Sequence, residues 1–217
     1  MGRSAPDHGG MCIDSQIIMK MVPNMAAVVM LICLMTCPSV ARELVPLRPE
    51  NMSCSFVQTK ESVMLQEKMV SSGRMYFSSP DKVRWEYMEP LSRVFIMNGE
   101  EAVFIADGKK QKVDLSKNRM FRGISQVMML GLSGSPLVSD NDFSVEVRET
   151  ALMWEVTMTP KKKDMARFMA EVRLVLRKTD CLVTRVTIVE PGGDLTCIEL
   201  KDIDLQTTAD EEKFDVR

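Results

Sequence analysis

Apolar and polar residues alternate in short runs along most of the chain after Cys54. In the run Lys82–Tyr87, the apolar residues Val83, Trp85 and Tyr87 occupy every second position and charged residues lie between them. Successive side chains of a strand point to opposite faces of a sheet, so this pattern predicts an antiparallel sheet with one apolar face. We expect about ten strands, beginning at Cys54 and continuing with Gly73–Phe77, Lys82–Tyr87, Arg93–Met97, Ala102–Ala106, Gln111–Leu115, Phe143–Arg148, Leu152–Met158, Val172–Leu176, Cys181–Glu190 and Leu195–Leu200.

Turn residues separate these runs and predict sequential hairpins. Asn98-Gly99 and Asp107-Gly108 are dipeptides that favour tight two-residue hairpin turns. The segment Pro191–Asp194 (PGGD) predicts a third such turn, with Pro191 opposite Asp194. That register places Ile188 opposite Cys197.

Two segments follow a helical rather than an alternating pattern. Met120–Leu132 carries an apolar stripe at helical spacing, although Gly123 and Gly131 make it a weak helix. Asp164–Ala170 is predicted as a second short helix. A meander of about ten strands with one apolar face must curl, and that face must be covered. The sequence therefore predicts a mainly β fold, an incomplete (half-open) antiparallel β-barrel capped by short helices, with the segment 120–132 as a lid.

The first forty residues have a different character. Met25–Thr36 is an apolar run of 12 residues, followed by small residues at Ser39 and Ala41, which is typical of a signal peptide. The run is short for a bilayer core of about 30 Å. We predict a signal peptide over residues 1–41 with cleavage after Ala41, and a single domain over 42–217. Because the stretch before Met19 is polar, we expect the signal peptide to begin later, at Met19 or Met21.

Two other interpretations of this leader stay open. The apolar run is an N-terminal membrane anchor in one of them. In the other, Leu34–Cys37 is a lipobox with a lipidated Cys37, although Thr36 stands where a Gly or Ala is usual. Lipidation would tether the mature protein to a membrane.

Composition excludes several classes of function. The net charge is −2 and the basic residues are scattered, which disfavours nucleic-acid binding. The only histidine, His8, lies in the leader, so the mature chain has no imidazole for a catalytic triad or a metal site. Cys54, Cys181 and Cys197 are predicted to be small apolar residues without a disulfide. We expect no enzyme activity, no cofactor and no metal.

Five groups of residues stand in a fixed order along the mature chain. They are Phe56-Val-Gln58-Thr-Lys60; Gly73, Phe77, Pro80, Trp85, Glu86-Tyr87 and Pro90; Asn98-Gly99; Met158-Thr-Pro-Lys161; and Gly193-Asp-Leu-Thr196. In type, spacing and order they resemble the periplasmic outer-membrane lipoprotein carrier (LolA) family, from about Cys54 to Phe214.

This resemblance implies a periplasmic chaperone with an unclosed β-barrel. Such a carrier binds acylated lipoproteins or lipids released by an inner-membrane ABC transporter and delivers them to an outer-membrane acceptor. We expect a monomer. Many members carry an Arg before the Pro that follows the second strand, where it latches the lid, but Ser79 occupies that place here. How the lid is held is therefore open.

The resemblance also selects the residues of a binding site. Alternation alone favours a solidly filled core, whereas a carrier needs a hollow apolar face. Flexible methionines suit such a face, and thirteen of the twenty remain after the leader. The predicted acyl-chain-binding residues are Met75, Phe77, Val83, Trp85, Tyr87, Trp154 and Val156, and the predicted lid residues are Met120, Ile124, Val127 and Met128.

Two related functions remain as alternatives. One is a lipid-anchored outer-membrane acceptor of the LolB type, which a lipid on Cys37 would favour. The other is a lipid- or lipoprotein-sensing module of the same fold, as in the regulator RseB. The sequence does not identify the cargo.

Overall fold

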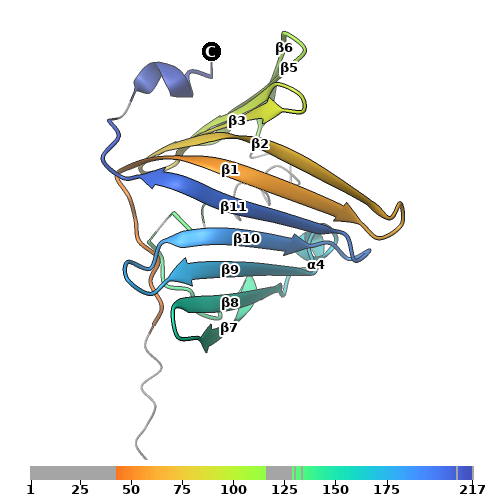
Figure 1. Cartoon of the computed structure of the whole chain (residues 1–217), viewed down its shortest axis with the longest axis vertical. Helices are drawn as coiled ribbons and strands as arrows, with labels where there is room; N and C mark the ends of the chain where they lie inside the picture. The colour runs from red at the N-terminus through yellow and green to blue at the C-terminus, as the bar shows by residue number, and fades with distance from the viewer. Residues whose placement is uncertain (1–42, 116–128, 130, 133, 209, 217) are drawn as a thin grey trace, which may run out of the picture. The chain divides into compact units, whose positions relative to one another are not determined.

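The computed structural model describes residues 43–115, 129, 131–132, 134–208 and 210–216 of the chain. Eleven strands in this part form one antiparallel sheet (Figure 1). The predicted signal peptide lies outside the described residues, as does most of the predicted helix 120–132. The elements are β1 (Asn51–Ser62), β2 (Glu67–Ser78), β3 (Lys82–Glu89), β4 (Arg93–Asn98), β5 (Glu101–Ala106), β6 (Lys109–Asp114), β7 (Phe143–Glu149), β8 (Met153–Pro160), α4 (Lys163–Ala166), β9 (Glu171–Arg177), β10 (Val183–Val189), β11 (Leu195–Asp204) and the 3-10 helix η1 (Glu211–Phe214).

The strand order is β6-β5-β4-β3-β2-β1-β11-β10-β9-β8-β7. Every pair except β1–β11 joins strands that are consecutive along the chain, so the sheet is a meander with one long-range pairing. That pairing sets Phe56 opposite Leu200 and Lys60 opposite Thr196. The first and last strands therefore lie in the middle of the sheet, and the edges come from the middle of the chain.

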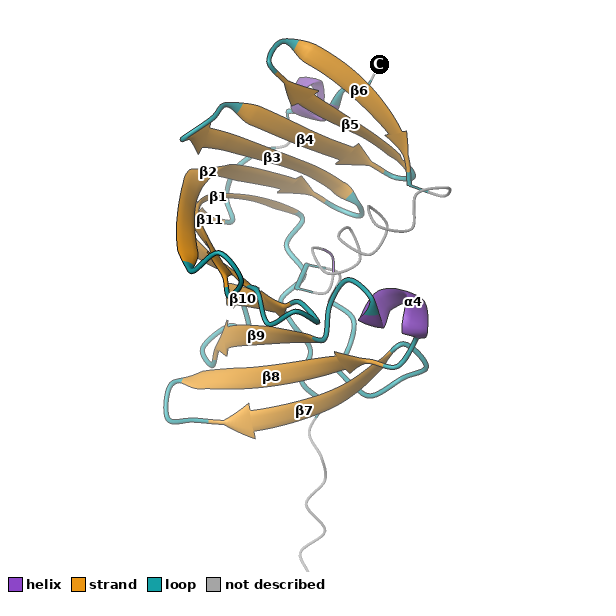
Figure 2. Cartoon of the chain, turned by 90° about the vertical axis from the view of Figure 1, so that its right-hand side faces the viewer, coloured by secondary structure: helices purple, strands orange, loops and turns teal. Residues whose placement is uncertain are grey.

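The sheet curves strongly, so that β1, β2 and β11 form the back of a concave surface (Figure 2). Register shifts interrupt three pairings, between Ser53 and Ser55, between Ser72 and Gly73, and between Val183 and Arg185. A bulge bends its strand and increases the local twist. These irregularities thus help the sheet to curl.

The two edge strands, β6 and β7, do not pair with each other in the described part of the chain. The barrel is therefore open, as predicted, and its eleven strands agree with the predicted number of about ten. Three of the six residues of the edge strand β6 are lysines, namely Lys109, Lys110 and Lys112. Charged side chains, lysine above all, protect an exposed edge from pairing with another chain.

Apolar side chains pack on both faces of the sheet. On the concave side, one cluster includes Phe56, Phe77 and Trp85, and a second includes Val156 and Leu174. On the convex side, Ile96 and Val103 of β4 and β5 pack against Val216 near the end of the chain. The concave face therefore carries most of the buried apolar residues, as the alternation predicts, and the convex face carries a smaller cluster.

The hairpin between β10 and β11 differs from the prediction by one residue. The amide of Glu190 donates to the carbonyl of Asp194 at 2.9 Å, so Pro191, Gly192 and Gly193 form a three-residue turn. Pro191 has no amide hydrogen and cannot close the hairpin itself, and Gly193 adopts a φ of +90°. The predicted pairing of Ile188 with Cys197 is therefore wrong: Ile188 lies opposite Thr196.

The other predicted turns and the short helix agree in kind and differ in detail. Asp107-Gly108 is the predicted two-residue turn, whereas Asn98 pairs with Glu101, so Gly99-Glu100 forms the turn there. The helix predicted over Asp164–Ala170 is the single turn α4. It ends early because the amide of Ala170 donates to the carbonyl of Val189 at 2.7 Å, which returns the chain to the sheet.

The three cysteines of the described part are free thiols, as predicted. Cys54 faces the concave side and is buried. Burial, followed by the nearby Asp202 carboxylate, raises the pKa of the Cys54 thiol to about 12. The thiol is therefore protonated at neutral pH and serves as a small apolar side chain.

Candidate functional site

A cavity of about 560 Å³ opens on the concave face of the sheet. Its volume lies within the range of roughly 300–1,000 Å³ that is typical of small-molecule sites. Strands β1 to β5, β10 and β11 supply most of the wall, and short segments near residues 131 and 168 supply the rest. The described lining residues are Gln58, Lys60, Met75, Trp85, Tyr87, Phe95, Phe104, Gly131, Leu132, Phe168, Met169, Leu182, Val183, Val186, Ile188, Glu190, Thr196, Ile198 and Leu200.

One wall of the cavity is a row of side chains that crosses four strands. Met75 of β2 lies opposite Trp85 of β3, Trp85 opposite Phe95 of β4, and Phe95 opposite Phe104 of β5. Directly opposed residues of an antiparallel sheet project from the same face. The register of three hairpins therefore brings together residues that lie far apart in the sequence.

The floor beside this row is an aromatic cluster. The ring centroids of Phe56 and Trp85 are 4.2 Å apart, and those of Phe56 and Tyr87 are 5.3 Å apart in an edge-to-face arrangement. Such pairs stabilise a packed arrangement beyond the area that they bury. The cluster gives the cavity a fixed apolar floor.

Gly73 makes room for the floor. A Cβ atom at this position would lie 1.7 Å from the carbonyl oxygen of Glu86 and 2.9 Å from the Cζ of Phe56. Only a residue without a side chain fits between β3 and the Phe56 ring. Glycine at this position therefore allows both the close approach of β3 and the packing of the Phe56 ring.

Polar groups gather at one part of the lining. The Tyr87 hydroxyl donates a hydrogen bond to Oε1 of Gln58 at 2.9 Å. Burial raises the pKa of Tyr87, so its hydroxyl stays neutral at physiological pH. Farther along β1, the Lys60 ammonium lies 3.2 Å from Oε1 of Glu190, and each side chain is 38% exposed. The cavity is therefore apolar with a solvated ion pair at its margin.

The structure places three of the seven predicted acyl-binding residues, Met75, Trp85 and Tyr87, in the cavity wall. Phe77 and Val83 lie on the same face but are packed within the core cluster. Trp154 and Val156 of β8 belong to the second cluster and do not line the cavity. The predicted lid residues Met120, Ile124, Val127 and Met128 lie outside the described residues.

Several lining residues were missed by the sequence prediction. Val186 and Ile188 of β10 face the cavity together with Thr196, Ile198 and Leu200 of β11. Their alternation is visible in the sequence and identifies their face. What the sequence does not reveal is that β11 pairs with β1, which brings the last hairpin to the centre of the site.

The described residues around the cavity are mostly apolar. Among them, no group of three or more His, Cys, Asp or Glu side chains is arranged to hold a metal ion. None of the helices in that part is long and apolar enough to cross a membrane. The cavity wall itself is mainly aliphatic and aromatic. Such a lining is chemically suited to an apolar ligand.

The sequence matches the family described as outer membrane lipoprotein carrier protein LolA over residues 49–217. A protein from Dechloromonas aromatica named outer-membrane lipoprotein carrier protein is 30% identical over 138 residues, which cover 64% of this chain and 57% of that protein. A protein of the same name from Halorhodospira halophila is 29% identical over 144 residues, which cover 66% of this chain and 64% of that protein. The chain thus spans less than two thirds of the length of either relative.

Two solved structures are similar at low identity. A LolA superfamily protein from Nitrosomonas europaea aligns with a TM-score of 0.45 and 8% identity, over 79% of this chain and 92% of the other. An uncharacterized conserved protein from Thermus thermophilus aligns with a TM-score of 0.45 and 11% identity, over 76% and 84%.

Proposed function

Because the chain belongs to the outer-membrane lipoprotein carrier (LolA) family, we propose that it is a periplasmic carrier that holds the acyl chains of lipoproteins in its concave cavity and shuttles them from the inner to the outer membrane. The family is one of carriers and not of enzymes, in agreement with the sequence prediction. The observation that carries the proposal is the apolar cavity of about 560 Å³ on the open face of the sheet.

The energetics of chain burial favour partial enclosure. Burying one methylene contributes about 0.8 kcal/mol, so a fully enclosed sixteen-carbon chain would contribute roughly 12 kcal/mol. Several such chains would exceed the ceiling of roughly 18–21 kcal/mol for non-covalent binding. A carrier must also release its cargo. A cavity that is open on one side binds an acyl chain and still allows it to dissociate.

The proposed route follows from the leader and the family. Cleavage after Ala41 would release the domain into the periplasm. There it would receive acylated lipoproteins from the inner-membrane lipoprotein-releasing ABC transporter and pass them, as a monomer, to an outer-membrane acceptor.

A transfer assay tests this proposal. Inner-membrane vesicles that contain the transporter and a labelled lipoprotein are incubated with ATP and the mature chain, and soluble lipoprotein bound to the chain is measured. We expect ATP-dependent release for the native chain. The substitution Ile188→Asp, which puts a charge in the cavity wall, should lose most of it, because an unpaired charge opposes apolar binding.

Thr187→Asp is the matched control, since Thr187 is the neighbour of Ile188 on the other face of β10. Release that is equal with and without the native chain would contradict the carrier function. Mass spectrometry of the mature N-terminus separates the alternatives. A free Arg42 fits the soluble carrier, and a lipid on Cys37 would instead indicate an anchored acceptor.

A further inference from the structure

The three central strands of the cavity each change from apolar to polar in the same direction. Along β1 the side chains on the concave face are Phe56, Gln58 and Lys60. In the antiparallel strand β11 the corresponding order runs against the sequence, as Leu200, Ile198 and Thr196. Along β10 and the residue after it, the order is Val186, Ile188 and Glu190. One such change would be unremarkable. Three in adjacent strands gather their polar lining residues at one end of the cavity, here called the polar end, where Phe168 and Met169 also contribute to the wall.

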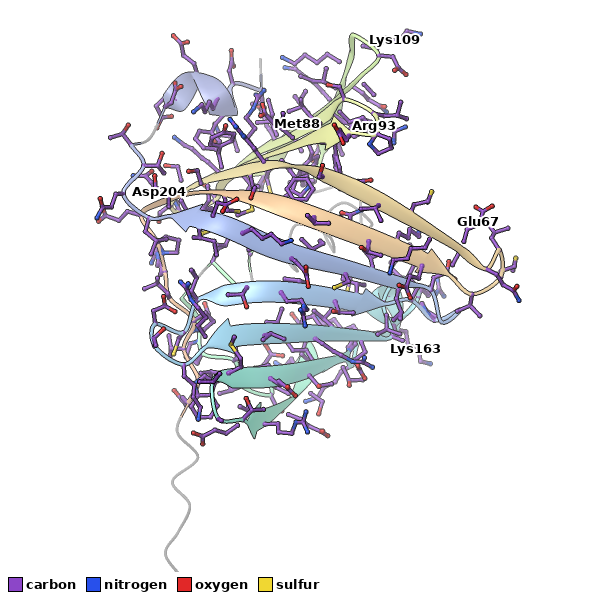
Figure 3. All side chains as sticks on the ribbon, viewed as in Figure 1. Glu67, Met88, Arg93, Lys109, Lys163 and Asp204 are labelled. Carbon is purple, nitrogen blue, oxygen red and sulfur yellow. The ribbon has the colours of Figure 1, made fainter. Side chains whose placement is uncertain are left out.

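The register brings the three polar residues together. Lys60 lies directly opposite Thr196, and Thr196 lies directly opposite Ile188, two residues before Glu190. The 3.2 Å contact between Lys60 and Glu190 spans β11 between them. This end of the sheet is the one that carries Glu67 and Lys163, whereas Asp204 marks the other end of β11 (Figure 3).

The apolar end is the row that contains Trp85. Cys54 of β1 lies opposite Met75, and Met75 lies opposite Trp85. Lys60 is six residues farther along β1, and a strand advances about 3.3 Å per residue, so the polar end is about 20 Å from the row of Trp85. The lining therefore extends along the strands as well as across them.

We propose that this cavity binds its ligand in one direction, with the methyl end of an acyl chain at Trp85 and Phe95 and a polar, amide-linked head at Lys60, Thr196 and Glu190. The inference deepens the proposed function, because it assigns the head of an acylated peptide to a defined site. The residues suit such a head. The Lys60 ammonium and the Thr196 hydroxyl donate hydrogen bonds to a carbonyl, and the Glu190 carboxylate accepts one from an amide.

The ion pair also indicates what kind of head is favoured. Lys60 alone would select an anionic group, but Glu190 balances its charge, so the site favours a head with both donors and acceptors over a simple carboxylate. Both side chains are partly exposed, which leaves the head hydrated and the attached peptide free to extend into solvent.

Depth-dependent quenching of tryptophan fluorescence tests the direction of binding. The chain has two tryptophans, and Trp154 does not line the cavity, so the mature Trp154→Phe variant reports on Trp85 alone. The probes are two N-acylated tripeptides with bromine either near the methyl end or near the carbonyl of the chain. We expect the methyl-end probe to quench most of the Trp85 emission and the carbonyl-end probe to leave most of it.

Equal or reversed quenching by bound probes would overturn the proposed direction while leaving the carrier function intact. Binding is measured independently by equilibrium dialysis. If neither probe binds, both the direction and the proposed function fail. The two failures are therefore distinguishable.

A second measurement tests the head site. The double variant Lys60→Met with Glu190→Gln should weaken binding of the acylated tripeptide about tenfold, equivalent to about 1.4 kcal/mol, whereas the neutral apolar dye N-phenyl-1-naphthylamine, which has no such head, should bind at least as tightly as to the native chain. Lys68→Met is the matched control, because Lys68 pairs with Glu61 at 2.9 Å and does not line the cavity. Unchanged tripeptide affinity in the double variant would contradict the head site.

Discussion

At Gly73 the backbone of β2 passes so close to β3 that a single added carbon would collide with the Glu86 carbonyl. We predict that Gly73→Ala lowers the free energy of unfolding by about 2 kcal/mol or more, because overpacking forces backbone shifts. Urea unfolding of the mature chain measures the loss.

Gly192→Ala serves as its control. No atom lies within 4 Å of a Cβ at Gly192, so this change should stay within about 0.5 kcal/mol of the native value. If Gly73→Ala were as stable as Gly192→Ala, the close approach of β2 and β3 would be contradicted.

Individual residues show how far a sequence alone identifies such a site. Met75, Trp85 and Tyr87 are found by alternation, because a strand sends every second side chain to one face. The same reasoning selects Trp154, which lies on the apolar face but outside the cavity lining. Phe168 lines the cavity from an irregular segment where no periodicity exists. The face on which a side chain lies follows from its position in the strand. Whether that side chain also lines the cavity depends on how the whole sheet bends.

Among the elements, the last segment of the chain has a clear structural role. The helix η1 places Phe214 and Val216 against the convex side, where Phe214 is 2% exposed. Arg84 of β3 donates a hydrogen bond to the carbonyl of Lys213 at 3.1 Å, and the Lys213 ammonium lies 4.3 Å from the centre of the Tyr76 ring. This segment covers apolar residues of β4 and β5 that would otherwise face solvent.

We therefore predict that Phe214→Ala destabilises the fold by about 3–5 kcal/mol, the usual cost of truncating a buried phenylalanine. Thermal unfolding, followed by far-UV circular dichroism, measures the change. Leu205→Ala, at a side chain that is 40% exposed, should have little effect. Equal melting temperatures for the two variants would show that the C-terminal segment is not packed as described.

Elements were more predictable than their exact ends. Strands with clear alternation, such as β3, were found almost to the residue, and β1 begins three residues before the predicted Cys54. The register of the last hairpin was missed because the missing amide of Pro191 moves the closing pair to Glu190. The pairing of β1 with β11 joins distant parts of the chain, and no local sequence pattern predicts it.

At the scale of the described part of the chain, the decisive property is that the curved sheet carries an apolar cavity on its concave face. Eleven strands bend around an apolar cavity, and the edges β6 and β7 remain apart. An ordinary core of this composition would pack to the density of an organic crystal. The proposed carrier function requires these open edges and this cavity, and the sequence alone could not distinguish them from a solid interior.

Isothermal titration calorimetry tests this property most directly. The mature protein is titrated with an N-palmitoylated peptide and, separately, with the same peptide without the palmitoyl group. We predict that only the palmitoylated peptide binds, at one site per chain, with a negative heat-capacity change because apolar surface is buried. Identical titrations for the two peptides would contradict the presence of an apolar ligand cavity.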